Sequence, residues 1–468
     1  MEIIDNDNLT LEGAIMRLRL FLAVCFLALT SGIASNLNIK YERFTLKNGL
    51  EIILHEDHSV PMVTVNVWYH VGSGREKPGR TGFAHLFEHI MFEGSGHVPE
   101  GKFDEWLEAA GGDNNGSTTS DRTNYYESLP SNAVELALFL ESDRMGFLLD
   151  AMSPEKVDGQ RDVVKNERRQ SYENRPYGMS SILIDSLLYP VDHPYHWPTI
   201  GSMEDLSRAS YQDVVDFFKM YYTPNNASIV IAGDIDPVRV KGQVEKWFNE
   251  IPRGATLPPI QAPVAYLSEE KRTVMEDNVQ LPRLIMAWHS PAMLTPGDGE
   301  LDVLANVLAG GKNSRLYKRL VYDMQIAQDV SAFQASSGLT SMFEISVTAR
   351  TGHGLTEIER VVQEEIDRVK ANAPELREVQ RAINQFEASF LNGLESIAGK
   401  ADQLNNYFMR TGNPDYFNED LARYKALSPN DVQTVAQSYL RNDGRVVLSV
   451  VPKGKLDLAS SGGLKEGN

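Results

Sequence analysis

Residues 82–92 read GFAHLFEHIMF, a segment in which two histidines and one glutamate interrupt an otherwise apolar run. At the period of a helix, His85 and His89 lie one above the other, with Glu88 beside them. The apolar residues cover nearly every other face, which is typical of a buried helix. Buried polar groups without partners cost roughly 1–3 kcal/mol each. The order H-x-x-E-H therefore predicts a metal ion as their common partner. The alternative is a chance match whose polar groups are satisfied by ordinary hydrogen bonds.

The composition is that of an ordinary globular protein, with 42% hydrophobic and 23% charged residues. At 468 residues the chain is longer than one typical domain, so two or more domains are expected. The 45 Lys and Arg residues against 64 Asp and Glu residues give a formal charge of −19. This charge repels phosphate backbones and anionic membrane surfaces on average, so nucleic acid is not an expected partner.

The start of the chain has the pattern of a secretory signal peptide. Arg17 and Arg19 precede the apolar residues 20–29, and small residues follow up to Ala34, where we expect cleavage. The apolar run is shorter than the roughly 20 residues that span a bilayer, so no stable membrane anchor is expected. We therefore predict an exported protein, located in the bacterial periplasm.

Two further features belong to this leader, residues 1–34. Residues 1–15 are acidic and lie ahead of Met16, a plausible initiator, so they are interpreted as a start-site extension. Cys25 is the only cysteine and lies inside the apolar run, so the mature protein would have neither a disulfide nor a cysteine metal ligand.

A Pro-rich stretch at residues 252–264 divides the rest of the chain into two parts of similar length. It lacks apolar periodicity and is interpreted as an extended linker. We predict an N-terminal domain at residues 41–251 and a C-terminal domain at residues 265–455.

The two parts end in similar patterns. Residues 206–222 give a capped helical pattern followed by a turn and a strand at 227–233, and residues 427–439 are likewise followed by a strand at 445–451. An internal duplication explains this similarity. Strand patterns at residues 49–54, 62–69 and 123–129 alternate unevenly with helices, which favours an α+β fold.

A catalytic zinc normally has three protein ligands and one open position, so H-x-x-E-H needs one more donor. The candidate is Glu167, in a helical stretch at residues 162–178 that Pro176 ends. With this glutamate the chain resembles the pitrilysin/insulysin family of inverted zinc peptidases, and more closely its processing-peptidase-like branch of half-length chains. The alternative for Glu167 is a solvated carboxylate on a charged helix.

The resemblance implies a fold, a cofactor and an activity. Two homologous domains, each a mixed sheet with helices packed on it, would face each other as a clamshell. His85, His89 and Glu167 would hold one Zn²⁺ per chain, and Glu88 would act as general base in cleaving a peptide bond. A peptide substrate would add as a strand to the sheet edge at Asn115, Gly116 and Ser117. The family usually has alanine where this chain has Gly116, and the alternative for this run is a plain turn.

Two departures from the family pattern affect the expected site. The family has a second-shell glutamate where this chain has Gln160, which can orient a ligand by hydrogen bonding but brings no charge. An arginine and a tyrosine that bind substrate and stabilise the oxyanion in self-sufficient members align with Val321 and Gln328. We therefore expect a paralogous partner carrying that pair, or a homodimer. The alternative is that Arg315 or Tyr317 replaces the pair.

Two functions thus remain open from the sequence. The first is a zinc endopeptidase for peptides or small unfolded proteins, forming the metal-bearing subunit of a pair. The second is a non-catalytic, zinc-containing peptide-binding or assembly subunit. The complete ligand set and Glu88 favour catalysis, whereas Val321 and Gln328 permit the second function.

Overall fold

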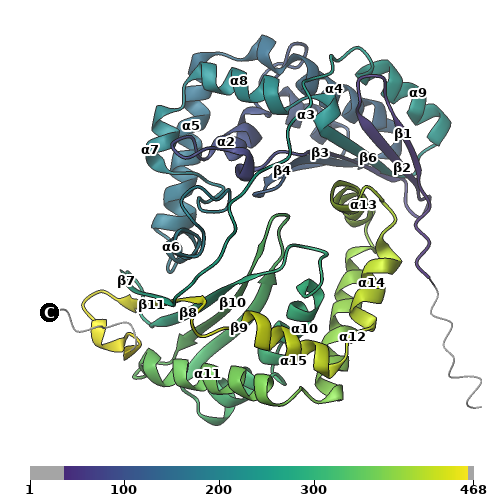
Figure 1. Ribbon diagram of the computed structural model, residues 1–468. Helices are drawn as coiled ribbons and strands as arrows, with labels where there is room; N and C mark the ends of the chain where they lie inside the picture. Colours follow the sequence, from purple (N-terminus) through teal and green to yellow (C-terminus); the bar gives the residue numbers. More distant parts are fainter. Residues whose placement is uncertain (1–35, 462–468) are drawn as a thin grey trace, which may run out of the picture. The chain divides into compact units, whose positions relative to one another are not determined.

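The computed structural model describes residues 36–461 (Figure 1). Residues 40–461 belong to one compact unit. The predicted signal peptide, its start-site extension and Cys25 lie outside the described residues. Within residues 36–461, no helix combines the length and apolar character needed to cross a membrane.

The N-terminal half contains a mixed sheet with strand order β1-β2-β6-β3-β5-β4, in which β2 and β6 pair in parallel and the other neighbours are antiparallel. Its strands are β1 Glu42–Thr45, β2 Glu51–Glu56, β3 Met62–Tyr69, β4 Asp113–Thr118, β5 Thr123–Pro130 and β6 Ala227–Gly233. Its helices are α2 Phe83–Ile90, α3 Lys102–Ala109, α4 Val134–Ala151, α5 Pro154–Arg168, α6 Met179–Leu188, α7 Met203–Arg208, α8 Tyr211–Tyr221 and α9 Pro237–Phe248.

The C-terminal half contains a second mixed sheet with strand order β7-β11-β8-β10-β9, in which β7 and β11 are parallel. Its strands are β7 Lys271–Asp277, β8 Arg283–Ser290, β9 Ala327–Ala335, β10 Ser341–Ala349 and β11 Arg445–Pro452. Its helices are α10 Asp298–Ala309, α11 Leu355–Ala371, α12 Leu376–Gly393, α13 Ile397–Thr411, α14 Phe417–Lys425 and α15 Pro429–Tyr439.

The two sheets have the same strand order once β1 is left out, and the parallel pair occupies the same place in each. This agreement supports the internal duplication, and the predicted α+β class with two homologous halves is confirmed. Residues 252–264 between the halves contain neither helix nor strand. The predicted domain boundaries stay a prediction.

One predicted helix is wrong. The pattern at residues 206–222 forms two helices, α7 and α8, because the chain breaks at Ala209 and Ser210. The Ser210 side chain accepts a hydrogen bond from the Asp213 amide and so starts a new helix. In the second half, Ser428 caps α15 in the same way through Asp431. A serine inside an apolar pattern was therefore the signal for a helix start.

The two faces of strand β3 pack against different layers of helices. Its residues Val63, Val65 and Val67 are fully buried in the core beneath the helices of the same half. The alternate residues point to the opposite face of the sheet, as the two-residue period of a strand requires. That face carries the Asn66 side chain, whose Nδ2 atom donates a hydrogen bond to Asp402 of α13 at 3.3 Å.

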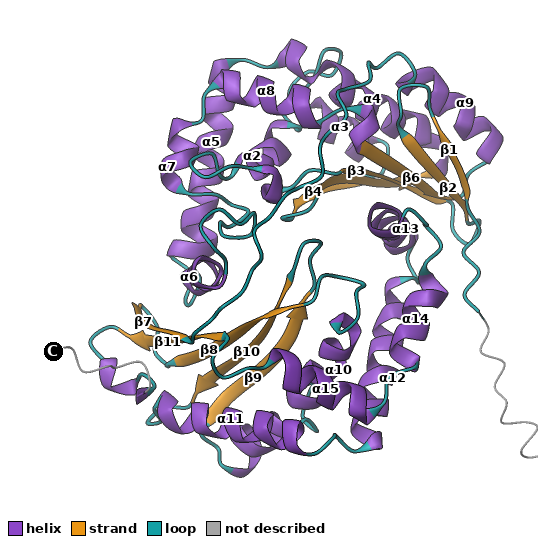
Figure 2. Ribbon diagram, viewed as in Figure 1, coloured by secondary structure: helices purple, strands orange, loops and turns teal. Residues whose placement is uncertain are grey.

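Each sheet is covered on one face by a helix from the other half of the chain (Figure 2). Helix α13 of the C-terminal half lies on β3 and β6, where Asn405 donates to the Asn66 carbonyl at 2.9 Å and accepts from Ser228 Oγ at 2.7 Å. Helix α6 of the N-terminal half lies on β8 and β11, where Ile184 and Leu188 belong to an apolar cluster with residues of these two strands. The two halves therefore exchange helices, since in each half one face of the sheet is covered by a helix from the other half.

Asp121 also joins the two halves. Its carboxylate accepts hydrogen bonds from Arg410 Nη2 on α13 at 2.6 Å and from the Gly338 amide in the β9–β10 turn at 2.8 Å. Tyr195 Oη donates to the same carboxylate at 2.5 Å. A single side chain in the turn after β4 thus connects segments from both halves.

Replacing Asn405 by alanine should lower the free energy of unfolding by about 1–3 kcal/mol, because the buried Ser228 hydroxyl would lose its acceptor and the fully buried Asn405 side chain would leave a cavity. Urea unfolding followed by circular dichroism measures the change. Asn392→Ala on the exposed side of α12 is the matched control and should change the free energy by less than about 0.5 kcal/mol. Equal stability of the two variants would contradict a structural role for the exchanged helix.

Candidate metal centre

Helix α2 carries the H-x-x-E-H motif and starts at a glycine for a steric reason. Gly82 has a φ of +87°, and a Cβ on it would lie 2.9 Å from the backbone of Gly201. The Glu76 carboxylate accepts hydrogen bonds from the amides of Gly82 and Ala84, which satisfies two of the free donors at the helix start. The beginning of the motif helix is therefore fixed from outside the helix.

The faces of α2 divide as the sequence pattern predicts. Its apolar residues are buried, and Leu86 and Phe87 are fully inaccessible to solvent. His85, Glu88 and His89 are only partly buried and share the remaining side. The helix is thus held in the core by its apolar faces while its three ionisable side chains remain reachable.

Glu167 comes from the last turn of helix α5. Ser153 caps the start of this helix through the Lys156 amide, and Pro154 occupies the first helical position, where its missing N–H costs nothing. Helix α5 packs directly against α2. The wider helical turn Arg169–Glu173 follows and ends the segment before Pro176, as expected.

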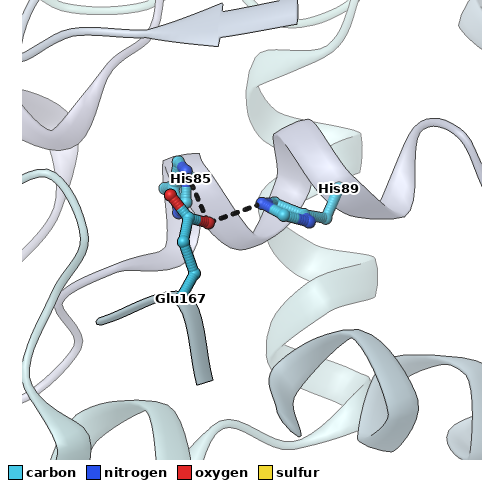
Figure 3. Close-up of side chains that lie close together, drawn as sticks. All are labelled: His85, His89 and Glu167. Carbon is cyan, nitrogen blue, oxygen red and sulfur yellow. Dashed lines mark ion pairs between the residues drawn. The ribbon is translucent and has the colours of Figure 1, made fainter. Parts of the chain in front are cut away.

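The structure brings the three predicted ligands together (Figure 3). Glu167 Oε2 lies 3.2 Å from His89 Nε2 and 3.7 Å from His85 Nε2, and the ligand atoms all lie within 4.8 Å of one another. Two imidazole nitrogens and one carboxylate oxygen at such spacing match a three-ligand zinc site, in which the donors lie about 2.0–2.2 Å from the metal. Within residues 36–461, this is the only cluster of three or more such side chains that could hold a metal ion.

The electrostatics of the cluster favour a bound cation. Burial lowers the pKa of His85 to about 4, so its imidazole is neutral at neutral pH. The hydrogen bond from His89 lowers the pKa of Glu167, which keeps its carboxylate ionised. Neutral imidazole and ionised carboxylate are the forms that bind metal ions.

Glu88 lies on the same side of α2 as the two histidines and reaches the edge strand β4. Its Oε2 atom accepts a hydrogen bond from Thr118 Oγ1 at 2.5 Å, and burial raises its pKa. A raised pKa suits a group that has to accept a proton and give it back near neutral pH.

The predicted substrate-binding residues lie on β4, the outermost strand of the N-terminal sheet, so the alternative of a plain turn is wrong for this run. The amide of Gly116 is bonded by the Asn115 side chain at 2.8 Å. Ser117 donates to Asn124 and accepts from Arg122, whose Nη1 lies 2.9 Å from the Ser117 carbonyl oxygen. The three residues thus lie at an outer sheet edge next to the metal-motif helix.

Other residues singled out from the sequence lie apart from the ligands. Gln160 donates its side-chain hydrogen bond to Glu93, at 2.5 Å, rather than to His85, His89 or Glu167. Val321 is buried in the wide helical turn Tyr317–Asp323, and Gln328 is exposed at the start of β9.

The two suggested replacements for the missing pair have other contacts. Arg315 forms a bidentate ion pair with Glu378, in which its Nε and Nη2 atoms donate to the two carboxylate oxygens at 2.9 and 2.7 Å. Tyr317 packs against the core of the C-terminal half. These contacts weigh against Arg315 and Tyr317 as replacements.

Two contacts at the site were not predicted from the sequence, those of Thr118 and Glu76. The two-residue period of β4 puts Thr118 on the same face as Gly116. A strand predicted from Asp113 onward would therefore have indicated that Thr118 faces the same way as Gly116. No sequence pattern indicated that Glu76 would reach the start of α2.

Comparison with known proteins agrees with this geometry. Residues 51–188 match the family model described as insulinase (peptidase family M16), and residues 208–386 match the model described as peptidase M16 inactive domain. The predicted ligands and Glu88 all lie in the first of these segments. The zinc protease PqqE of Helicobacter pylori is 28% identical over 423 residues, which cover 88% of this chain and 93% of that protein.

Further relatives extend the comparison to subunits and structures. The probable mitochondrial-processing peptidase subunit beta of Arabidopsis thaliana is 24% identical, covering 87% of this chain and 78% of that protein. The crystal structure of a protease from Helicobacter pylori has a TM-score of 0.83 at 25% identity and covers 88% of this chain and all of its own. A putative M16-like peptidase from Alicyclobacillus acidocaldarius shares the fold, with a TM-score of 0.77, 21% identity and coverage of 90% and 100%. The chain therefore belongs to peptidase family M16, in its half-length branch.

Proposed function

We propose that this chain is a zinc endopeptidase of peptides or small unfolded proteins, and that it is the metal-bearing subunit of a pair. The observation that carries the proposal is the convergence of His85, His89 and Glu167 with Glu88 on the same helix side. Relatives named zinc proteases over nearly the whole chain support it. The exported, periplasmic location stays part of the proposal.

The chemistry at the site is divided between the metal and the chain. Zinc, when bound, lowers the pKa of water and polarises a carbonyl group. Glu88 accepts the proton of the attacking water as its oxygen bonds to the scissile carbonyl carbon. Glu88 then gives the proton to the leaving amine as the C–N bond breaks.

Strand β4 supplies a docking edge for an extended peptide. It is the outermost strand of its sheet and packs against α2, so a peptide paired with it would run past Glu88. The Gly116 amide donates to the Asn115 side chain at 2.8 Å, and a docked peptide carbonyl would take the place of that acceptor.

A non-catalytic zinc-containing subunit is the second candidate. The burial of Val321 and the bidentate pairing of Arg315 favour it, because the C-terminal half then offers no arginine and tyrosine in the family positions. A paralogous partner bearing that pair is the arrangement that our first candidate favours, because a second copy of this chain would bring the same Val321 and Gln328.

Metal analysis of the purified protein tests the ligand assignment. We expect one zinc per wild-type chain and a loss of nearly all of it in His89→Ala, because two ligands cannot hold a catalytic zinc tightly. His58→Ala is the matched control, since His58 is exposed and pairs with Glu56 and Asp234 instead. A full zinc equivalent in His89→Ala would rule the assignment out.

A further inference from the structure

We infer that Thr118 is a positioning residue for Glu88, and that strand β4 thereby sets the general base as well as docking the substrate. The inference rests on the proposed function. The Thr118 hydroxyl donates to the Glu88 carboxylate, with Oγ1 at 2.5 Å from Oε2. A hydrogen bond from a hydroxyl to a carboxylate is charge-assisted and stronger than a neutral one.

The surroundings of Glu88 leave this role to Thr118. On the β4 side, Gly116 stands beside the Glu88 stem, and a Cβ on it would lie only 3.1 Å from Glu88 Cγ. A side chain at this position would therefore crowd the Glu88 stem, so the backbone of β4 lies directly beside it. Gly116 does not have a positive φ, so its backbone conformation in β4 does not itself require glycine.

The geometry of β4 makes Thr118 suited to hold the carboxylate. Residues 116 and 118 are two apart on a strand and share the face that meets α2. A β-branched threonine has a restricted χ1, so its hydroxyl is presented in a fixed direction. With Oε2 bonded to Thr118, Oε1 remains available to exchange a proton with water.

This arrangement links two functions through one short strand. The neighbours Asn115 and Ser117 point to the opposite face of β4 and bond within the sheet edge, whereas Thr118 bonds the base. A shift of β4 on peptide docking would therefore move the Glu88 carboxylate with it. Misplacing a catalytic group by about 1 Å costs about 10²-fold in rate.

Kinetics of three variants test the inference. Thr118→Val should lower kcat about 10- to 100-fold and leave KM within about twofold, because it removes the hydroxyl but not the docking edge. Thr118→Ser restores the hydroxyl and should return most of kcat. Thr45→Val is the matched control, since Thr45 lies on β1, the opposite outer strand of the sheet, and donates the same kind of bond to Glu51 of β2. Zinc content should stay unchanged in all three.

A measurement without turnover accompanies the kinetics. In cobalt(II)-substituted protein, the visible spectrum reports the environment of the metal's open position, and Glu88→Gln gives the reference change. Thr118→Val should shift the spectrum in the same direction, whereas Thr118→Ser and Thr45→Val should not. A wild-type spectrum and wild-type kcat in Thr118→Val, beside an inactive Glu88→Gln, would overturn the inference and leave the proposed function intact. Failure of the wild-type protein to bind metal, or a wild-type kcat in Glu88→Gln, would overturn both the inference and the proposed function.

Discussion

Replacing Glu88 by glutamine should lower kcat by about 10²–10⁴-fold while the protein keeps its zinc. The amide is close in shape to the carboxylate and can still contact Thr118, but it cannot accept the proton of the attacking water. His85, His89 and Glu167 are untouched by the change, so metal binding should persist. Hydrolysis of a flexible fluorogenic peptide, together with metal analysis of the same sample, measures both properties.

The control for this change is Glu108→Gln, on the exposed side of α3. It makes the same chemical replacement away from the metal centre and should leave kcat unchanged. Normal turnover by Glu88→Gln would refute the assigned role of Glu88 as general base.

The second large effect concerns the C-terminal half, where Val321 and Gln328 stand in place of the arginine and tyrosine. The isolated chain should be a poor peptidase, and adding a paralogous partner with that pair should raise kcat about 10²–10³-fold. This is the loss measured elsewhere on removing one oxyanion-stabilising donor. The assay compares one peptide with the chain alone and with an equimolar partner.

The structure sharpens the choice of controls for this second experiment. Val321 is 8% exposed, so an arginine placed there would disturb the core, whereas Gln328 is exposed and should tolerate tyrosine. Arg315→Ala should weaken the packing around Glu378 without changing the gain produced by the partner. Full activity of the chain without any partner would contradict a divided site.

The sequence predicted those parts of the site that follow from local periodicity. The i, i+4 spacing placed His85 and His89 on one side of a helix, and the family resemblance supplied Glu167, which the structure brings within 3.2 Å of His89. Thr118 could not be predicted in the same way, because its contact with Glu88 depends on how β4 packs against α2. Gln160 shows the same limit, since it lies on α5 seven residues before Glu167 but its hydrogen bond goes to Glu93.

The fold was predicted to a similar extent. The repeated closing units indicated two related halves, and the common strand order agrees with that. The break between α7 and α8 was missed because the apolar pattern continues across Ser210 while the capping bond restarts the helix. The exchange of α6 and α13 had no local signal, because an amphipathic helix pattern does not specify which sheet the helix covers.

The exchange of α6 and α13 bears on how a duplicated protein of this kind can arise. Both helices lie at equivalent places, ahead of the helix and strand that close their own halves. A single copy of the repeated unit would leave one face of its sheet bare and would be complete only as a symmetric pair of chains trading that helix. Fusing two copies through a linker makes the trade intramolecular and so independent of protein concentration. The two copies were then free to diverge, one keeping the histidines and glutamates while the other lost the need for them.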